Sequence, residues 1–177
     1  MCDACTDNTK QIITQFLPQL SQYKSIHILS TNYHLAGIAR NEGLSIAQGK
    51  YIWFIDGDDW LLGSSAIQLC YKVITEHPDL DVLEFDFDCP EKYSKYLRQG
   101  EAVGAVWPYW FKRNALGKAR FPSIAAHEDV YFLRHLSKKR LLTAKIKNKL
   151  YYYNYMREGS IIWGLVQKGL LNNETLA

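Results

Sequence analysis

The stretch ARNEGLSIAQGKYIWFIDGDDWLL, residues 39–62, contains a helix, a strand and an acidic loop in direct succession. Arg40 and Asn41 open the predicted helix, and its apolar positions, among them Leu44, are spaced as on one helix face. Gly49 is the residue at which we expect a left-handed C-cap to end the helix. Residues 51–55 are an unbroken aromatic and β-branched run, which predicts a strand that is covered on both faces. The unit is typical of an α/β protein.

Three aspartates, Asp56, Asp58 and Asp59, follow this strand within four positions. Carboxylates so close in sequence repel one another, and their joint ionisation is costly without a positive charge beside them. A hard divalent cation, Mg²⁺ or Mn²⁺, would neutralise them and leave coordination sites for phosphate oxygens. Ligands of open α/β sheets also bind beyond the carboxyl ends of strands. The alternative is that Asp-Gly-Asp-Asp is a polar turn, because Asp and Gly are favoured in turns.

Composition limits the classes of protein to consider. A chain of 177 residues with 47% hydrophobic content can form one good core, so we expect a single domain over residues 1–177. The net charge of +3 is too small to indicate a nucleic-acid partner. The sequence has no apolar run of about 20 residues, as a membrane span requires, and the polar residues after Met1 do not form a signal peptide. These features predict a cytoplasmic location.

The four cysteines are expected to be reduced thiols without a chemical role. Cys2 and Cys5 form a Cys-x-x-Cys pair, but Cys70 and Cys89 do not make a second pair with metal-site spacing.

The remaining pattern predicts alternating helices and strands. Thr6, Asp7 and Asn8 are candidate N-caps, and Ser64 or Ser65 is the candidate for a later helix that Pro78 stops. The predicted helices cover residues 12–20, 67–74 and 133–141, the predicted strands cover residues 25–29, 81–87 and 145–149, and the predicted loops cover residues 32–39 and 89–104.

The residues 39–62 also resemble a known family. Arg-Asn before the helix, Gly-x-Tyr-Ile-x-Phe into the strand and Asp-x-Asp-Asp-x-Leu out of it resemble the sugar-nucleotide segment of the family 2 glycosyltransferases, which are inverting enzymes of the GT-A fold. The resemblance implies a Rossmann-like nucleotide-diphospho-sugar transferase fold, with a mixed, mostly parallel sheet flanked by helices. Family members carry one more strand and helix before the part that is matched here, so we expect an N-terminally truncated domain.

The resemblance divides the chain and assigns donor-side roles. Residues 1–90 are the expected nucleotide-sugar-binding half, residues 91–162 the acceptor and catalytic-base half, and residues 163–177 a C-terminal tail. Residues 3–9 resemble the family's Asp-Gly-Ser-Thr-Asp-Asn-Thr loop, with Ala4 and Cys5 in place of Gly and Ser. The implied nucleotide-sugar ligands are Asp3 at the base, Arg40 and Asn41 around the nucleotide, Asp56 at the ribose or metal, and Arg157 at the pyrophosphate; the implied metal ligands are Asp58 and Asp56. A solvated terminus for Asp3, a surface salt bridge for Arg40 and a structural ion pair for Arg157 are the alternatives.

Acceptor-side roles come from two further segments. Glu128-Asp129 before an apolar helix resembles the family's Glu-Asp motif, in which Asp129 would be the general base and Glu128 would orient the acceptor or support the base. The alternative is that both are acidic residues favoured by the helix dipole. Residues 106–113 resemble a family helix below the acceptor site, although an aromatic run of this kind is also typical of a core.

Two functions remain open at this point. The first is a metal-dependent inverting transferase that moves a sugar from a nucleotide-diphospho-sugar, with UDP favoured, to a glycan or lipid-linked acceptor in cell-surface polysaccharide synthesis. The second is a truncated, non-catalytic binding or partner subunit of the same fold. Peripheral membrane association at the inner face and homo-oligomerisation are further expectations, because the tail could dock on the core or lie on a membrane and an uncovered strand edge tends to pair.

Overall fold

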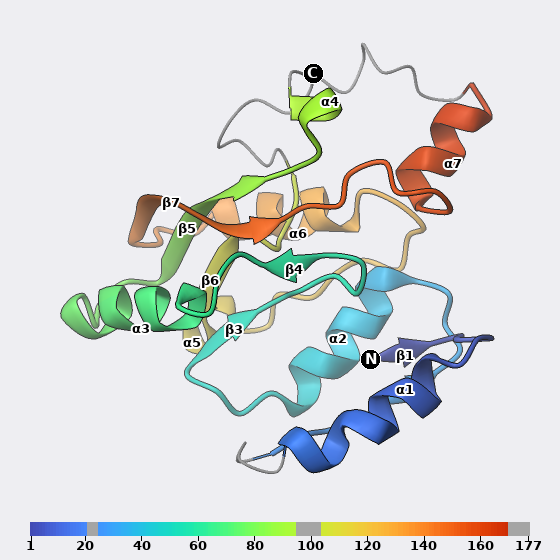
Figure 1. Cartoon of the computed structure of the whole chain (residues 1–177). Helices are drawn as coiled ribbons and strands as arrows, with labels where there is room; N and C mark the ends of the chain where they lie inside the picture. Colours follow the sequence, from blue (N-terminus) through green and yellow to red (C-terminus); the bar gives the residue numbers. More distant parts are fainter. Residues whose placement is uncertain (21–24, 95–103, 170–177) are drawn as a thin grey trace.

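The structure is a computed structural model, and it describes residues 1–20, 25–94 and 104–169 (Figure 1). Helices and strands alternate along most of the chain. The helices are α1 (Thr9–Phe16), the 3₁₀ helix η1 (Leu17–Leu20), α2 (Ala36–Ile46), α3 (Ala66–Glu76), α4 (Glu91–Ser94), α5 (Arg113–Leu116), α6 (Glu128–Ser137) and α7 (Ile161–Gln167). The strands are β1 (Cys2–Asp3), β2 (Ser30–Thr31), β3 (Tyr51–Trp53), β4 (Trp60–Leu61), β5 (Val82–Asp88), β6 (Tyr109–Lys112) and β7 (Thr143–Tyr152).

The strands form two sheets. β1 and β2 pair in parallel, and the larger sheet has the order β3-β6-β5-β7-β4. β5 and β7 are parallel, whereas β6 runs antiparallel to both β3 and β5, and β4 runs antiparallel to β7. The predicted α/β architecture with a mixed sheet is confirmed. The share of parallel pairing is lower than predicted, because β6 lies antiparallel between β3 and β5.

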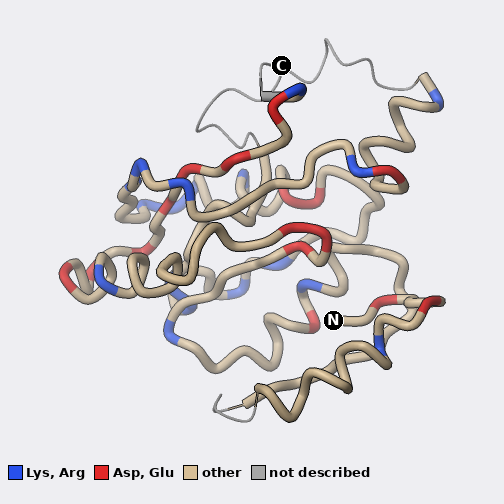
Figure 2. The backbone as a smooth tube through the Cα atoms, in the orientation of Figure 1, with Lys and Arg blue, Asp and Glu red and all other residues tan. Residues whose placement is uncertain are grey.

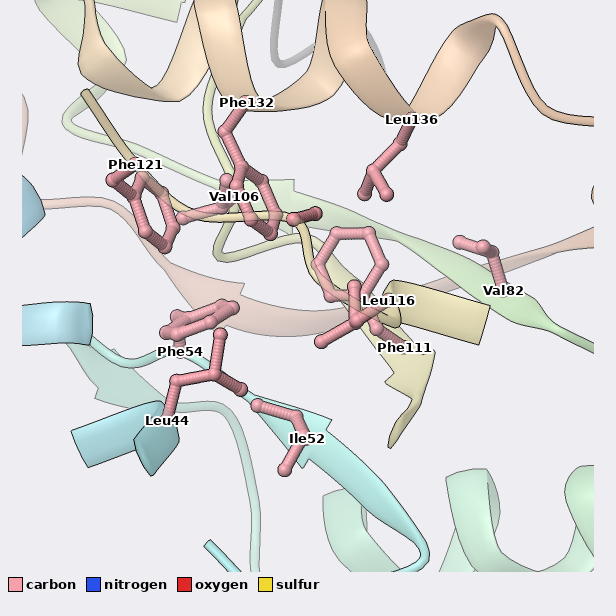
Figure 3. Close-up of a cluster of buried hydrophobic side chains, with 11 residues drawn as sticks. Leu44, Ile52, Phe54, Val82, Val106, Phe111, Leu116, Phe121, Phe132 and Leu136 are labelled. Atoms are coloured by element: carbon pink, nitrogen blue, oxygen red, sulfur yellow. The ribbon is translucent and has the colours of Figure 1, made fainter. Parts of the chain in front are cut away.

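Helices cover both faces of the larger sheet. On one face, Leu44 of α2 and Phe132 and Leu136 of α6 belong to one buried cluster with Ile52 and Phe54 (Figure 3). On the other face, α3 contributes Ala66, Cys70 and Ile74 to a second cluster with the strand residues Leu83 and Phe85. The alternating burial along β5 supplies both clusters, since neighbouring side chains of a strand point to opposite faces. The sheet therefore fixes α2 and α6 beside each other on one side.

Several predicted elements are confirmed within a few residues. Asn8 is the N-cap of α1 and Ser65 the N-cap of α3, which ends before Pro78, and the predicted strand 81–87 is β5. Of the predicted loop 89–104, residues 91–94 form α4, and residues 95–103 lie outside the described residues.

Other boundaries were predicted wrongly. The strand predicted at residues 25–29 lies at Ser30–Thr31, where pairing with β1 determines its position. α2 begins at Ala36, so Arg40 lies in its second turn instead of opening it, and the end of the predicted loop 32–39 is helical. The helix ends at Ala47 in extended conformation, not at a left-handed Gly49.

The second half of the chain also needed corrections. The segment that resembles a family helix contains the strand β6, because its backbone pairs with both β3 and β5. Its aromatic side chains are core, as the alternative reading had it, since Trp107, Trp110 and Phe111 are buried. α6 starts at Glu128 and ends at Ser137, earlier than predicted, and β7 extends the predicted strand 145–149 at both ends.

The described residues do not include a helix that is both long and apolar enough to cross a lipid bilayer. The first part of the tail forms α7, with Ser160 at its N-cap accepting a hydrogen bond from the Trp163 amide at 3.2 Å. Residues 162–166 are half-buried, and residues 170–177 lie outside the described residues.

Ala4 has a backbone conformation that favours glycine. Its φ is +52°, in the left-handed region, and its amide donates to the Thr31 carbonyl oxygen at 2.8 Å, so pairing with β2 holds it there. A residue with a Cβ in this conformation destabilises the fold by about 1–2 kcal/mol. Glycine removes that strain but stabilises the unfolded chain by about 0.4–1 kcal/mol, because it has more backbone freedom there. We expect Ala4→Gly to raise the free energy of unfolding by up to about 1 kcal/mol in urea titrations. Ala36→Gly, at an ordinary helical position, is the control and should not raise it.

Candidate active site

The acidic loop, residues 56–59, joins β3 to β4 and carries a run of acidic positions (Figures 1 and 2). The Asp59 amide donates to the Asp56 carbonyl oxygen at 3.2 Å, which closes the loop into a tight turn. Each of the three carboxylates has its own partners: Asp56 pairs with Arg40, Asp58 with Arg157, and Asp59 with Tyr151 and Asn154. Arginines and hydrogen-bond donors therefore relieve the repulsion that the sequence predicts.

Asp59 is fixed to the end of β7. The Tyr151 hydroxyl donates to Asp59 Oδ2 at 2.7 Å and accepts from the Asp56 amide at 3.1 Å, and the Asn154 amide donates to Asp59 Oδ1 at 2.8 Å. Burial raises the pKa of Asp59 to about 6, although these hydrogen bonds act in the opposite direction. Asp59 is thus engaged in holding the loop in place. Sequence reasoning did not assign a role to Tyr151, although it lies in an aromatic run after a predicted strand and in a Leu-Tyr-x-Tyr segment that resembles the family's ending.

Tyr151→Phe tests how strongly this contact holds the acidic loop. Tyr151 is fully buried and stacks on Trp107 with ring centroids 4.7 Å apart, so phenylalanine keeps the packing and removes only the hydroxyl. The change leaves the Asp56 amide and Asp59 Oδ2 without this partner, and we expect unfolding to cost about 1–3 kcal/mol less. Tyr71→Phe, on the exposed side of α3, is the matched control and should change stability by less than about 0.5 kcal/mol. Equal stability of Tyr151→Phe and wild type would show that the loop does not depend on this hydroxyl.

Asp58 forms an exposed ion pair with Arg157. Its Oδ2 accepts from Arg157 Nε at 2.9 Å, and the two side chains are 34% and 45% exposed, respectively. Ion pairs exposed to this degree contribute about 0–1 kcal/mol. Arg157 can therefore leave Asp58 at small cost when another cation binds. Two of the predicted site residues, Asp58 and Arg157, are thus in direct contact, and their roles stay predictions.

The chemistry of this donor set suits a divalent ion held jointly with a ligand. Residues 1–20, 25–94 and 104–169 contain no group of three or more His, Cys, Asp or Glu side chains that could hold a metal by themselves. Mg²⁺ commonly binds through one or two carboxylates plus substrate phosphates. Asp58 and Asp56 supply two such carboxylates, on a loop that is partly open to solvent. The residues fit a metal that arrives with a phosphorylated ligand.

Arg40 connects the acidic loop to the start of α6. From the second turn of α2, its Nη2 donates to Asp56 Oδ1 at 2.7 Å, and its Nη1 donates to Glu128 Oε1 at 2.7 Å and to Asp129 Oδ1 at 2.8 Å. The side chain is 14% exposed, and the guanidinium carbon lies 5.5 Å from the centre of the Phe121 ring. Burial opposes the charge of Arg40, but the carboxylates more than offset it and raise the pKa of the guanidinium. Three carboxylates from two distant segments of the chain thus contact the Arg40 guanidinium.

Asp129 has surroundings suited to a base. Its Oδ2 accepts from the Val106 amide at 3.1 Å, while Oδ1 contacts Arg40. Burial raises the pKa of Asp129 to about 7; Arg40 lowers it, and the charge of Glu128 raises it further. A carboxyl group with a pKa near neutrality can both accept and release a proton at physiological pH. Glu128 and Asp129 also lie in the first turn of α6, where the helix dipole favours negative charge, so the alternative prediction is met as well.

Asn41 lies next to Arg40 but faces a different partner. Its Nδ2 donates to the Phe121 carbonyl oxygen at 2.9 Å, and its Oδ1 accepts from the Phe121 amide at 2.9 Å. The side chain therefore clamps the loop that leads to α6. Gly37 supports the same approach, because a Cβ there would lie 3.0 Å from the Pro122 carbonyl oxygen and 3.1 Å from Glu128 Cγ. The structure thus gives Asn41 a contact with the loop before Glu128 and Asp129, and its role around the nucleotide stays a prediction.

A cavity of about 740 Å³ connects the N-terminal strand to the acidic loop, and Asp3, Arg40 and Asp56 are among its lining residues. Asp3 accepts hydrogen bonds from the Thr31 hydroxyl at 2.8 Å, the Tyr33 amide at 2.7 Å and the Leu35 amide at 3.1 Å. Burial acts against its charge, but these bonds more than offset that and lower the pKa of Asp3. Asp3 is thus an ordered carboxylate at the cavity, and not a solvated terminal residue.

Comparison with known proteins gives a consistent result. The model of the family described as "Glycosyl transferase family 2" matches residues 2–142. Glycosyltransferase GlyG of Streptococcus pneumoniae is 33% identical over 46% of this chain and 26% of its own length. The poly(ribitol-phosphate) beta-glucosyltransferase of Bacillus spizizenii is 23% identical over 85% of this chain and 29% of its own length.

A crystal structure of S. aureus TarS in complex with UDP-GlcNAc superimposes with a TM-score of 0.70, at 21% identity, over 89% of this chain and 49% of that chain. At this identity the likeness shows the fold, which is that of the predicted family. The chain spans only 26% to 52% of the length of the curated relatives that it matches.

Proposed function

The chain belongs to glycosyl transferase family 2, and from that premise we propose that it transfers a sugar from a nucleotide-diphospho-sugar, with UDP as the nucleotide, to a hydroxyl group of a glycan or lipid-linked acceptor. The transfer inverts the anomeric configuration and serves cell-surface polysaccharide synthesis. The proposal rests on the family and on the side chains that the fold brings together around Arg40.

The observation that carries the proposal is the contact of one guanidinium with both acidic groups. Asp56 belongs to the loop after β3, and Asp129 belongs to the start of α6, yet both lie within 2.8 Å of Arg40 nitrogen atoms. Inverting transfer needs a carboxylate that accepts the proton of the attacking hydroxyl, within about 3 Å of it. It also needs positive charge at the departing diphosphate. Asp129 and the acidic loop would meet these two requirements from neighbouring positions around Arg40, which supports the proposal.

Donor binding uses the cavity and the acidic loop. Asp3 is held by backbone amides at the cavity and would accept a hydrogen bond from the nucleotide base. Asp56 would contact the ribose or the metal, and Arg157 would contact the pyrophosphate after it leaves Asp58. A Mn²⁺ or Mg²⁺ ion held by Asp58 and Asp56 would supply charge stabilisation for the leaving diphosphate. These roles agree with the small cost of separating the exposed pair Asp58–Arg157.

On the acceptor side, Asp129 is the general base. The Val106 amide and Arg40 hold its two oxygens in a fixed direction, and Asn41 holds the loop before it, so little reorganisation is needed when the acceptor arrives. Glu128, which shares Arg40 Nη1 with Asp129, would orient the acceptor or support the base.

A donor screen tests the proposed function. UDP-linked and GDP-linked sugars are supplied with Mn²⁺, and the released nucleoside diphosphate is measured. We expect release from at least one UDP-sugar, dependent on metal and increased by an acceptor glycan. UDP binding without release from any donor would favour the non-catalytic partner subunit, and the absence of both binding and release would contradict a nucleotide-sugar site.

A further inference from the structure

Arg40 has an arrangement that goes beyond charge balance. Its guanidinium contacts three carboxylates from two separate elements, so that Asp56 on the donor side and Glu128 and Asp129 on the acceptor side share a single positive charge. We propose that Arg40 is a positioning residue that couples the two sides of the site. Donor binding then alters the contact between Arg40 and Asp129, and loss of the Asp129 charge alters the affinity for the donor. This inference rests on the proposed function.

The geometry explains why the coupling would pass through Arg40. Nη2 is the group that contacts Asp56, and Nη1 is shared by Glu128 and Asp129, so the guanidinium cannot move towards one side without loosening its contacts to the other. The side chain is 14% exposed, and the Phe121 ring lies against it, which leaves little water to take over a lost contact. In such surroundings a change of charge at one carboxylate is screened weakly.

The direction of the effect follows from the charges. A divalent cation at Asp56 and Asp58 repels Arg40 and shifts it towards Glu128 and Asp129. Removing the charge of Asp129 has the reverse effect, because Arg40 then concentrates on Asp56 and opposes the cation. Coupling is reciprocal in binding free energy. If donor binding strengthens the contact between Arg40 and Asp129, then loss of that contact weakens the binding of a metal-bound donor fragment, although Asp129 lies on the acceptor side.

A thermodynamic cycle tests the coupling by binding alone. UDP is titrated into the full chain in the presence of Mn²⁺, and heats are measured for wild type, Asp129→Asn, Arg40→Gln and the double variant. We expect Asp129→Asn to weaken UDP binding by about fivefold or more when Arg40 is present. In the Arg40→Gln background the same change should alter the Kd by less than about twofold. If Arg40→Gln does not fold, Arg40→Lys replaces it. Lysine keeps the positive charge but lacks the planar guanidinium that can contact both sides at once, so it should give an intermediate coupling.

Asp79→Asn is the matched control, since it removes the same charge at an exposed position between α3 and β5. An Asp129→Asn effect no larger than that of Asp79→Asn would overturn the coupling, and so would an effect of equal size with and without Arg40. The absence of any Mn²⁺-dependent UDP binding to wild type would instead overturn the proposed function, and the coupling with it.

Discussion

Asp129→Asn should reduce the turnover number for sugar transfer by about 10²–10⁴-fold, because asparagine keeps the shape of the side chain but cannot take a proton from the acceptor. The Val106 amide and Arg40 contact the two oxygens of Asp129, so the variant retains at least one partner and is expected to fold. Donor turnover is measured as released UDP at saturating donor and acceptor.

The pH dependence provides a second readout of the same residue. Burial raises the pKa of Asp129 to about 7. Below that pH the carboxyl group is protonated and cannot act as a base, so kcat/KM should rise with pH to a plateau above about 8. Asp129→Asn should lose this rise along with its activity. Asp79→Asn, at an exposed position before β5, controls for the loss of one carboxylate; a decrease in turnover as large as that of Asp129→Asn would contradict a specific role for Asp129.

Asp58→Ala should lower UDP release by about 10²–10³-fold at fixed Mn²⁺ concentration, a loss comparable to removing one preorganised group that stabilises the leaving charge. Asp58 is 34% exposed, and its ion pair with Arg157, at 2.9 Å, is exposed as well, so folding should be unaffected. The loss of activity should therefore appear without a shift in the unfolding midpoint.

Arg157 allows the metal role of Asp58 to be separated from its ion pair. If Asp58 mattered only through Arg157, then Arg157→Gln and Asp58→Ala would raise the Mn²⁺ concentration needed for half-maximal activity equally. We expect Asp58→Ala to raise it strongly and Arg157→Gln to change mainly the KM for the donor. Full activity of Asp58→Ala at low Mn²⁺ would show that the ion, if one is used, is held elsewhere.

The sequence predicted the parts of the fold that depend on local pattern. The helix–strand–loop unit around Leu44 and Ile52 and the alternating strand β5 were found because their apolar spacing matches the period of the element. The strand β6 was missed, because its aromatic run fits a buried helix or a buried strand equally well until its partners β3 and β5 are known. The start of α2 was missed because its N-cap residue, Leu35, makes no side-chain capping hydrogen bond.

Site residues were predictable where a motif marked them, and their partners were not. The sequence predicted chemical roles for Asp56, Asp58 and Asp129, and the fold brings Asp56 and Asp129 to the same guanidinium. It did not indicate that Asn41 would clamp Phe121, or that a tyrosine would fix the acidic loop. Such contacts join residues more than 70 positions apart, and they depend on the packing of whole elements.

The most direct test of a metal-dependent nucleotide-sugar site is calorimetric titration of UDP into the wild-type chain and into Asp58→Ala, with Mn²⁺ and with EDTA. We predict binding to wild type that requires Mn²⁺ and is lost in Asp58→Ala. UDP binding of equal affinity in Mn²⁺ and in EDTA, or binding that Asp58→Ala leaves unchanged, would contradict the central role of the acidic loop.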